Sequence, residues 1–197
     1  MPPRPRRKLT SVTKSNALQY TAVFWDELFA ELAKEYPDVA TEKYHVDAMA
    51  AAFITRPETL DVVVASNLFA DILTDLGGAL QGSLGFPASA NLNPEKRYPS
   101  MFEPVHGSAP DIASRGIANP IAAIWAGAML LEHLGEAEAA GLIYGAIESV
   151  TAERRVRTPD LGGRATTAEM GDAIRGALTG ARRSAPGSGT RAAGTTR

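Results

Sequence analysis

The sequence predicts an α/β fold in which a mostly parallel sheet is flanked by helices. Strand-like segments alternate with helical segments along the first part of the chain, and this alternation is the pattern of parallel strands joined by crossover helices. The strand-like segment 61–65 is apolar at every position after Asp61, as expected for a strand buried on both faces. A sheet of this kind places its ligands at the edge where the strands end.

Each element of the first part has a local signal. Apolar residues at helical spacing predict a helix with one continuous core face, and the Tyr-Pro-Asp sequence that includes Pro37 ends it. The residues of that face are Leu18, Ala22, Trp25, Phe29 and Leu32. We expect strands over residues 8–13, 41–46 and 61–65, and helices over residues 16–35, 47–54 and 67–81.

A change in composition predicts a domain boundary near residue 82, where glycines and then the polar stretch 89–99 interrupt the helical pattern. Three helical segments lie beyond it. Residues 120–134 carry proline in the first turn and Gly135 just past the end. Residues 136–153 are amphipathic, and the pattern from Thr166 to Glu169 is a capping box that opens the last helix. The last residues contain almost no large apolar side chain, so we expect a disordered tail. The predicted parts are 1–82, 83–180 and 181–197.

The composition excludes several classes of protein. A formal net charge of −2 and a pI of about 5.9 offer no attraction for nucleic acid. The chain has no cysteine, which excludes disulfides, thiolate nucleophiles and zinc–thiolate sites. No apolar run reaches the roughly 20 residues that span a bilayer, and no hydrophobic segment of a secretory signal follows the basic start. We therefore expect a cytoplasmic protein without membrane or nucleic-acid partners.

Two carboxylates lie one helical turn apart in the expected helix 67–81. Asp71 and Asp75 stand at positions i and i+4 and share one face, whereas Leu68, Ile72 and Leu76 are expected to face the core. Carboxylates held this close repel each other unless a cation or a proton lies between them, so a hard divalent ion, Mg²⁺ or Mn²⁺, suits the pair. The alternative is a solvated acidic helix face.

Two further charged residues follow expected strands. Asp47 opens a helix directly after a strand, where it is either an N-cap residue or a third metal carboxylate. Lys14 lies between a strand and a helix, at a similar end of the sheet. Its side chain is either solvated or, next to a metal, a general acid or base.

The segment 102–112 has the composition of a ligand-binding loop. It is rich in glycine, proline and small residues and leads through Asn119 to a helix, so it exposes backbone groups. His106 suits stacking or hydrogen bonding to a ligand. Asp111 either caps a turn or binds ribose hydroxyls, in which case its charge favours NAD over NADP. The sequence has neither a Gly-x-Gly-x-x-Gly fingerprint nor a P-loop.

Residues 67–77 (NLFADILTDLG) and 101–112 (MFEPVHGSAPDI) carry a family resemblance. With them the chain resembles the metal-dependent β-decarboxylating hydroxyacid dehydrogenases, which act on 3-isopropylmalate, isocitrate, D-malate or tartrate. The resemblance extends over about residues 6–180. Residues 12–17, 24–27 and 91–95 look most like the tartrate and D-malate enzymes, and 3-isopropylmalate dehydrogenase is the alternative. Ala70 stands where the family has glycine.

The resemblance implies an isopropylmalate dehydrogenase-like fold whose N-terminal part, with the substrate-binding arginines and the catalytic tyrosine, is missing. Residues 1–82 would be the remainder of the domain that holds the dimer interface and the metal site. Residues 83–180 would be the C-terminal part of the NAD-binding domain.

The resemblance also implies site residues. Asp47, Asp71 and Asp75 would bind Mg²⁺ or Mn²⁺, and Lys14 and Asp47 would be catalytic and reach in from the partner of a homodimer. The implied cofactor-binding residues are Glu103, His106, Gly107, Ser108, Ala109, Pro110, Asp111, Ile112 and Asn119. The implied reaction is the NAD-dependent oxidation, with or without β-decarboxylation, of a small 2-hydroxy dicarboxylate of the D-malate or tartrate type. The alternative of another class is that the chain is a catalytically silent module for dimerisation and NAD binding.

Overall fold

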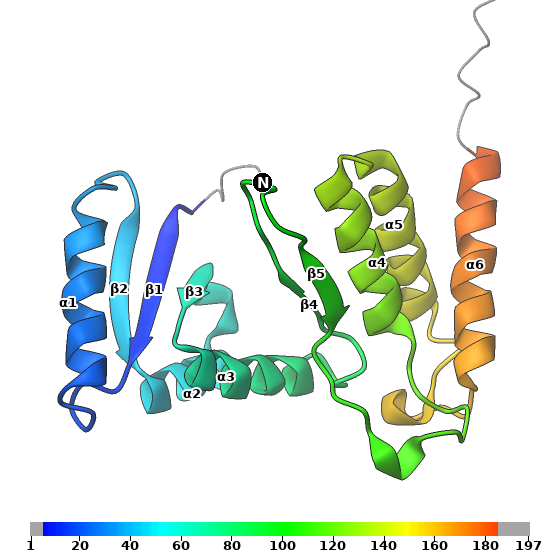
Figure 1. Ribbon diagram of the computed structural model, residues 1–197. Coiled ribbons are helices and arrows are strands. Elements are labelled where there is room, and N and C mark those ends of the chain that lie inside the picture. The colour runs from blue at the N-terminus through cyan, green and yellow to red at the C-terminus, as the bar shows by residue number, and fades with distance from the viewer. Residues whose placement is uncertain (1–5, 185–197) are drawn as a thin grey trace, which may run out of the picture. The chain divides into compact units, whose positions relative to one another are not determined.

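The computed structural model describes residues 6–184 (Figure 1). The chain divides into two compact units, Met1–Gly82 and Ser83–Arg197, which we call unit 1 and unit 2 and describe separately. None of the described helices is long and apolar enough to cross a membrane.

Unit 1 is built on a three-stranded parallel sheet of order β2-β1-β3. Its strands are β1 (Lys8–Thr13), β2 (Ala40–His45) and β3 (Val62–Val64). β1 pairs with β2 along its whole length, and its residues 9–11 pair with β3. The predicted parallel sheet is confirmed, although β3 is shorter than the expected strand 61–65.

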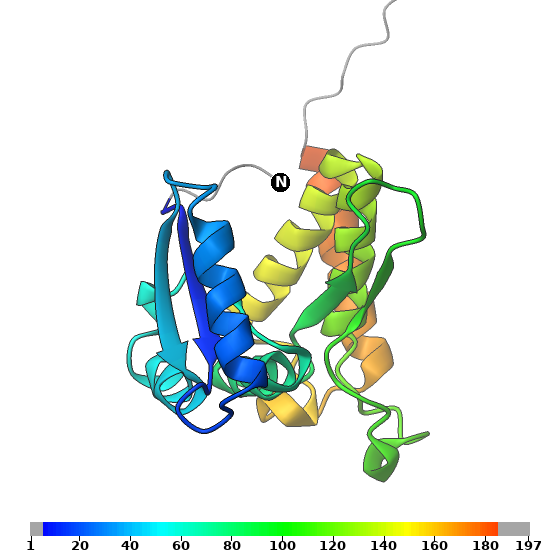
Figure 2. The same cartoon turned by 60° about the vertical axis from the view of Figure 1, so that its left-hand side comes forward.

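Helices cover both faces of this sheet. They are α1 (Thr21–Ala33), α2 (Val46–Thr55) and α3 (Asn67–Leu80), with a short 3-10 turn at Pro57–Thr59. On one face, Trp25 of α1 donates its indole N–H to Ser11 Oγ over 2.9 Å, and Figure 2 shows α1 alongside β1 and β2. Successive strand residues face opposite sides, so the neighbouring Val12 packs on the other face, with Met49 and Leu73.

The first helix begins at Thr21 rather than at Asn16. The preceding residues form turns in which the backbone N–H groups of Ala17 and Leu18 both donate to the Lys14 carbonyl, over 2.9 and 2.8 Å. The predicted core face is therefore only partly correct. Ala22 is buried, whereas Leu18 is 45% exposed.

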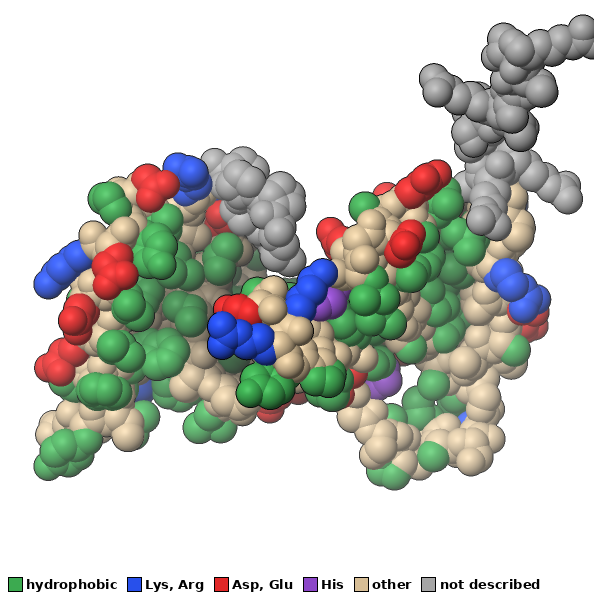
Figure 3. Space-filling model, turned by 45° about the horizontal axis from the view of Figure 1, so that its top comes forward, with side chains coloured by type: hydrophobic (Ala, Val, Ile, Leu, Met, Phe, Trp, Pro, Cys, Tyr) green, Lys and Arg blue, Asp and Glu red, His purple; other side chains and the backbone are tan. Residues whose placement is uncertain are grey.

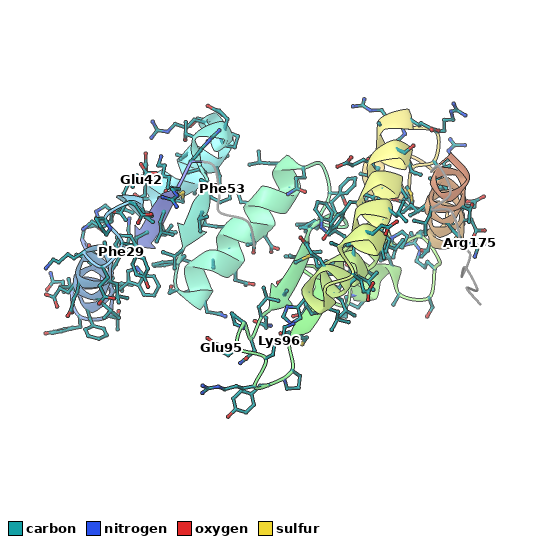
Figure 4. The ribbon with its side chains drawn as sticks, turned by 90° about the horizontal axis from the view of Figure 1, so that it is seen from above. Phe29, Glu42, Phe53, Glu95, Lys96 and Arg175 are labelled. Atoms are coloured by element: carbon teal, nitrogen blue, oxygen red, sulfur yellow. The ribbon has the colours of Figure 1, made fainter. Side chains whose placement is uncertain are left out.

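The predicted core face of α3 is wrong at Leu68 and Ile72, whereas Leu76 is half-buried. Leu68 and Ile72 are 66% and 58% exposed, whereas Leu73 is buried and Phe69 packs beside it. The helix is turned so that its glycine side meets α2, and a Cβ on Gly77 would lie 3.5 Å from the Phe53 ring, which is labelled in Figure 4. This close packing against α2 decides which apolar residues of α3 are buried.

Unit 2 begins with an antiparallel pair of strands that the sequence does not reveal. β4 (Ala88–Asn91) lies where a polar connection was expected, and β5 (Met101–Pro104) includes the start of the predicted loop. Ala88 pairs with Pro104 and Asn91 with Met101. Figure 4 shows Glu95 and Lys96 at the tip of the connection between the two strands.

The regular elements in the rest of unit 2 are helices, and they agree with the predicted segments. It comprises α4 (Ile121–Leu134), α5 (Ala137–Glu153) and α6 (Thr167–Ser184), with short 3-10 turns at Pro110–Ile112 and Pro159–Leu161. α4 packs on the strand pair and on α5, and α5 packs on α6 (Figure 1). Their core is centred on Ile121, Ile147 and Met170. As predicted, Gly135 ends α4 in the left-handed conformation, with φ of 95°.

The predicted capping box at the start of α6 is confirmed. The Thr166 backbone N–H donates to Glu169 Oε2 over 2.7 Å, and the Glu169 N–H donates to Thr166 Oγ1 over 3.2 Å. The bond from the Thr166 N–H, and a second one from the Thr166 hydroxyl to the same carboxyl oxygen over 2.9 Å, lower the pKa of Glu169. The helix continues to Ser184, so residues 181–184 belong to α6 and not to the predicted tail. Residues 185–197, the rest of that tail, lie outside the described residues.

We expect Thr166→Ala to lower the free energy of unfolding by about 1 kcal/mol, because it removes the side-chain acceptor of the capping box. The measurement is urea denaturation followed by circular dichroism. Thr179→Ala is the matched control, since the Thr179 hydroxyl donates to carbonyl oxygens inside its own helix, those of Arg175 and Gly176. Equal effects of the two substitutions would contradict a capping role for Thr166.

Candidate functional site

An ion pair joins the ends of two neighbouring strands of unit 1. Lys14 follows the last residue of β1, Thr13, which pairs with His45 at the end of β2. Asp47 lies in the first turn of α2, two residues beyond His45. The parallel register therefore brings both side chains to one edge, where Lys14 Nζ lies 2.7 Å from Asp47 Oδ1.

This geometry decides the local role of Asp47. The N-cap residue of α2 is His45, so Asp47 is not the N-cap residue that its position suggested. The hydrogen bond from Lys14, followed by those from the backbone N–H groups of Asp47 and Ala48, holds the pKa of the Asp47 carboxyl below its ordinary value. The Asp47 side chain is 69% exposed and that of Lys14 is 27% exposed. The ion pair thus consists of a partly buried lysine and a solvent-accessible carboxylate at one edge of the sheet.

Asp71 and Asp75 lie on α3, which follows β3 at the same edge of the sheet. Both are exposed and share the helix face expected from their spacing. In the part of the chain that the structure describes, no group of three or more acidic or histidine side chains is arranged to hold a metal ion. The structure thus brings Asp71 and Asp75 to one face and pairs Asp47 with Lys14, but it does not join Asp47 to the other two carboxylates.

The candidate cofactor loop, residues 106–112 of unit 2, is exposed in its middle. The residues from Gly107 to Asp111 are exposed, whereas His106 and Ile112 are half-buried. Ala109 has a left-handed φ of 43° that starts the 3-10 turn, an unfavourable conformation for a residue with a Cβ. His106 Nδ1 lies 3.0 Å from the Gly107 carbonyl oxygen. Of the other predicted residues, Ser108 and Pro110 lie within the exposed stretch, and Glu103 is exposed on β5.

Hydrogen bonds to other segments hold the loop at its two ends. Before it, the Val105 N–H donates to the Pro87 carbonyl over 3.0 Å. After it, Thr167 binds two carbonyl oxygens: its N–H donates to Gly116 over 2.8 Å and its hydroxyl to Ala118 over 2.6 Å. The backbone bonds between these anchors are local, for example from the Ile112 N–H to the Ala109 carbonyl. The loop is thus anchored by hydrogen bonds at both ends, and its middle is accessible to solvent.

Asn119 differs from the other predicted cofactor residues because it is buried, with 8% exposure. Its Oδ1 accepts the Ile121 N–H over 3.0 Å, and its Nδ2 donates to Asp160 Oδ2 over 2.9 Å. Both the oxygen and the nitrogen of its side-chain amide are therefore used in hydrogen bonds within the protein, next to the start of α4.

Asp160 and Ser83, which complete this contact, were not among the predicted site residues. Asp160 lies far along the chain from both partners, in a short turn before two glycines. No spacing rule relates such distant residues, so the sequence carries no signal that would have found them.

We expect Lys14→Met to raise the pKa of Asp47 towards its ordinary value of 3.8, because the largest cause of its depression is lost. The pKa is read from the carboxyl carbon signal in a nuclear magnetic resonance titration. Lys43→Met is the control, since Lys43 pairs with Asp26 over 2.8 Å and not with Asp47. An unchanged Asp47 titration in Lys14→Met would show that the ion pair does not exist in solution.

Comparison with known proteins gives a consistent family. The model of the isocitrate/isopropylmalate dehydrogenase family matches residues 2–174. A probable tartrate dehydrogenase/decarboxylase of Agrobacterium vitis is 56% identical over 177 residues, which is 90% of this chain and 49% of that protein. The D-malate dehydrogenase (decarboxylating) of Escherichia coli strain K12 is 53% identical over 176 residues, which is 87% of this chain and 48% of that protein.

Solved structures agree with the sequence relatives. The isocitrate dehydrogenase of Methylococcus capsulatus matches with a TM-score of 0.82 and 46% identity, over 87% of this chain and 50% of that one. A β-decarboxylating dehydrogenase of Thermococcus kodakarensis matches with a TM-score of 0.75 and 38% identity, over 89% of this chain and 51% of that one. The chain spans about half the length of the curated relatives it matches. With its strands, helices and family match in agreement, the chain belongs to the isocitrate/isopropylmalate dehydrogenase family.

Proposed function

We propose that the chain supplies the lysine, the carboxylates and the cofactor loop of an NAD- and metal-dependent dehydrogenase. Its substrate would be a small 2-hydroxy dicarboxylate of the D-malate or tartrate type, oxidised with or without β-decarboxylation. The observation that carries the proposal is the 2.7 Å contact between Lys14 and Asp47 at the carboxyl edge of the sheet. Such an edge is where α/β sheets bind ligands.

Asp71 and Asp75 fit a hard divalent ion, Mg²⁺ or Mn²⁺, because they offer carboxylate oxygens from one exposed helix face. Among residues 6–184, one chain brings no third carboxylate to them, so we propose that Asp47 of the partner subunit completes the set in a homodimer. When bound, such an ion acts as a Lewis acid that polarises a hydroxyl or carbonyl oxygen. The role of the two aspartates is to hold the ion at a fixed position beside the substrate.

Lys14 would act on protons. Its ammonium group lies within hydrogen-bond reach of a carboxylate and can exchange a proton with the substrate's hydroxyl oxygen, as general acid or base. Asp47 would hold the lysine side chain in one orientation between these transfers. In this proposal Lys14 transfers the proton and Asp47 positions Lys14.

The loop 106–112, with Glu103 on β5, would bind NAD. The exposed Asp111 carboxylate can accept hydrogen bonds from ribose hydroxyls, and its negative charge disfavours a 2′-phosphate, so NAD is expected over NADP. The side chain of Asn119 is buried and hydrogen-bonded within the protein, so Asn119 would contribute to the site through its backbone or by supporting the loop.

The surface of α3 favours a partner subunit. Leu68 and Ile72 are large apolar side chains exposed next to Asp71 and Asp75, and Figure 3 shows hydrophobic side chains at the surface of unit 1 among charged ones. Apolar side chains in this setting are typical of an interface. We propose a homodimer that acts in the cytoplasm, on a small molecule and without nucleic-acid or membrane partners.

Two alternatives remain. 3-Isopropylmalate is the second substrate candidate within the family. The candidate of another class is a catalytically silent module for dimerisation and NAD binding. Turnover by the chain alone on D-malate would eliminate the silent module, whereas turnover only together with a full-length relative would favour it.

The test of the proposed function combines binding and turnover. We expect the chain to bind NAD and Mn²⁺ in calorimetry. Asp71→Asn should weaken Mn²⁺ binding by about 10-fold or more, since even residues behind the metal ligands cost that much. Asp172→Asn on α6 is the control, because it removes the same charge from an exposed surface pair. Reduced NAD is then followed with D-malate, tartrate and 3-isopropylmalate. A wild-type chain that binds neither NAD nor Mn²⁺ would exclude the proposal.

We expect Ile72→Asp to weaken self-association by about 10-fold or more, because it places a charge in an apolar contact. Sedimentation equilibrium measures the dissociation constant. Tyr98→Asp is the control, since Tyr98 is 73% exposed on the connection between β4 and β5. A wild-type chain that stays monomeric at high concentration would contradict the proposed homodimer.

A further inference from the structure

Three polar side chains from distant segments of unit 2 meet at the start of α4. Asp160 Oδ2 accepts a hydrogen bond from the Ser83 hydroxyl and another, over 2.9 Å, from Asn119 Nδ2. Ser83 and Asn119 are buried, with 8% exposure each. The Asp160 carboxylate thus links the beginning of unit 2, the segment just before α4 and the turn between α5 and α6.

Gly85 makes this meeting possible. A Cβ there would lie 2.7 Å from Asn119 Cβ and 3.1 Å from Asp160 Oδ2. Its backbone is also bonded on both sides: its N–H donates to Ser83 Oγ over 2.8 Å, and its carbonyl accepts the Ala122 N–H over 3.0 Å. Side-chain atoms of Asn119 and Asp160 therefore occupy the place that a Cβ at this position would take.

The same contacts use donor groups at the start of α4. The N–H of Ile121 binds Asn119 Oδ1, and that of Ala122 binds the Gly85 carbonyl. These helix amides are therefore satisfied by protein acceptors and are not offered to a phosphate. What the cluster fixes instead is the position of Asn119, at the end of the segment that begins with the candidate cofactor loop.

Asp160 is suited to hold this position because it carries a charge. Burial raises the pKa of its carboxyl, but hydrogen bonds led by the one from Ser83 outweigh burial and keep the pKa below the ordinary value. The group is therefore a carboxylate at neutral pH. Hydrogen bonds to an ionised acceptor are about twice as strong as those between neutral groups.

We propose that Asp160 is a positioning residue of the candidate cofactor loop. It acts through Asn119, which it holds next to the Thr167 anchor at Gly116 and Ala118. With that end fixed, the exposed middle of the loop is presented in one arrangement, and binding then costs less ordering entropy. The inference rests on the proposed NAD site for its effect on binding, but the effect on the loop does not depend on NAD.

The test compares Asp160→Ala and Asp160→Asn with the control Asp172→Asn. Without NAD, hydrogen–deuterium exchange should increase in peptides covering residues 105–122 for Asp160→Ala and stay unchanged for the control. NAD affinity, by calorimetry, should fall about 10-fold in Asp160→Ala, since hydrogen bonds to a charged group are lost. Asp160→Asn keeps one acceptor oxygen and should lie between, and it serves as the test if the alanine variant does not fold.

A readout outside unit 2 separates positioning from general damage. Mn²⁺ affinity, which the proposal assigns to Asp71 and Asp75 in unit 1, should not change in either Asp160 variant. Unchanged exchange of residues 105–122 in the Asp160 variants would overturn the inference, as would equal losses of NAD and Mn²⁺ affinity. A wild-type chain that fails to bind NAD would overturn the proposed function, while the exchange result would still decide whether Asp160 holds the loop.

Discussion

The parallel register of β1 with β2 is the constraint on which the candidate site depends. Because parallel strands end at the same edge, the pairing of Thr13 with His45 leaves Lys14 and Asp47 as the next charged residues on neighbouring segments. Their contact needs no special loop, only strands of equal length that end together. The buried side chains behind this edge, Val12 among them, fix the strands and so fix the ion pair.

In unit 2, the candidate cofactor loop is held in a defined place although it contains little regular structure. This glycine- and proline-rich loop forms no regular element beyond a short turn, so it takes its position from hydrogen bonds at either end. Those bonds come from the strand pair, from α6 and from the turn at Asp160. An accessible loop that is anchored at both ends is thereby positioned by the rigid elements around it.

Local sequence signals were sufficient to predict those strands and helix ends that depend on residues close together in the sequence. The apolar run around Val63 predicted a parallel strand, and Gly135 and the Thr166 capping box predicted helix ends that the structure contains. The rotation of α3 was not predictable, because both sides of that helix carry leucine or isoleucine and only packing on α2 decides between them. The β4–β5 pair and the Asp160 cluster were not predicted for a related reason. Their residues are distant from one another along the chain, and hydrophobic periodicity relates only residues that are close in the sequence. The i, i+4 spacing placed Asp71 and Asp75 on one face but could not show how far Asp47 lies from them.

The absence of a side chain at Gly85 has a consequence for how this region tolerates change. The space beside Asn119 is already filled, and a single added methyl group would compete for it with the contact that joins three segments. Replacing glycine by alanine is among the mildest changes in chemical terms, since it alters neither charge nor polarity. At Gly85 the added methyl group would push the Asn119 and Asp160 side chains apart. Residue 85 is therefore restricted by the volume available and not by the need for a functional group.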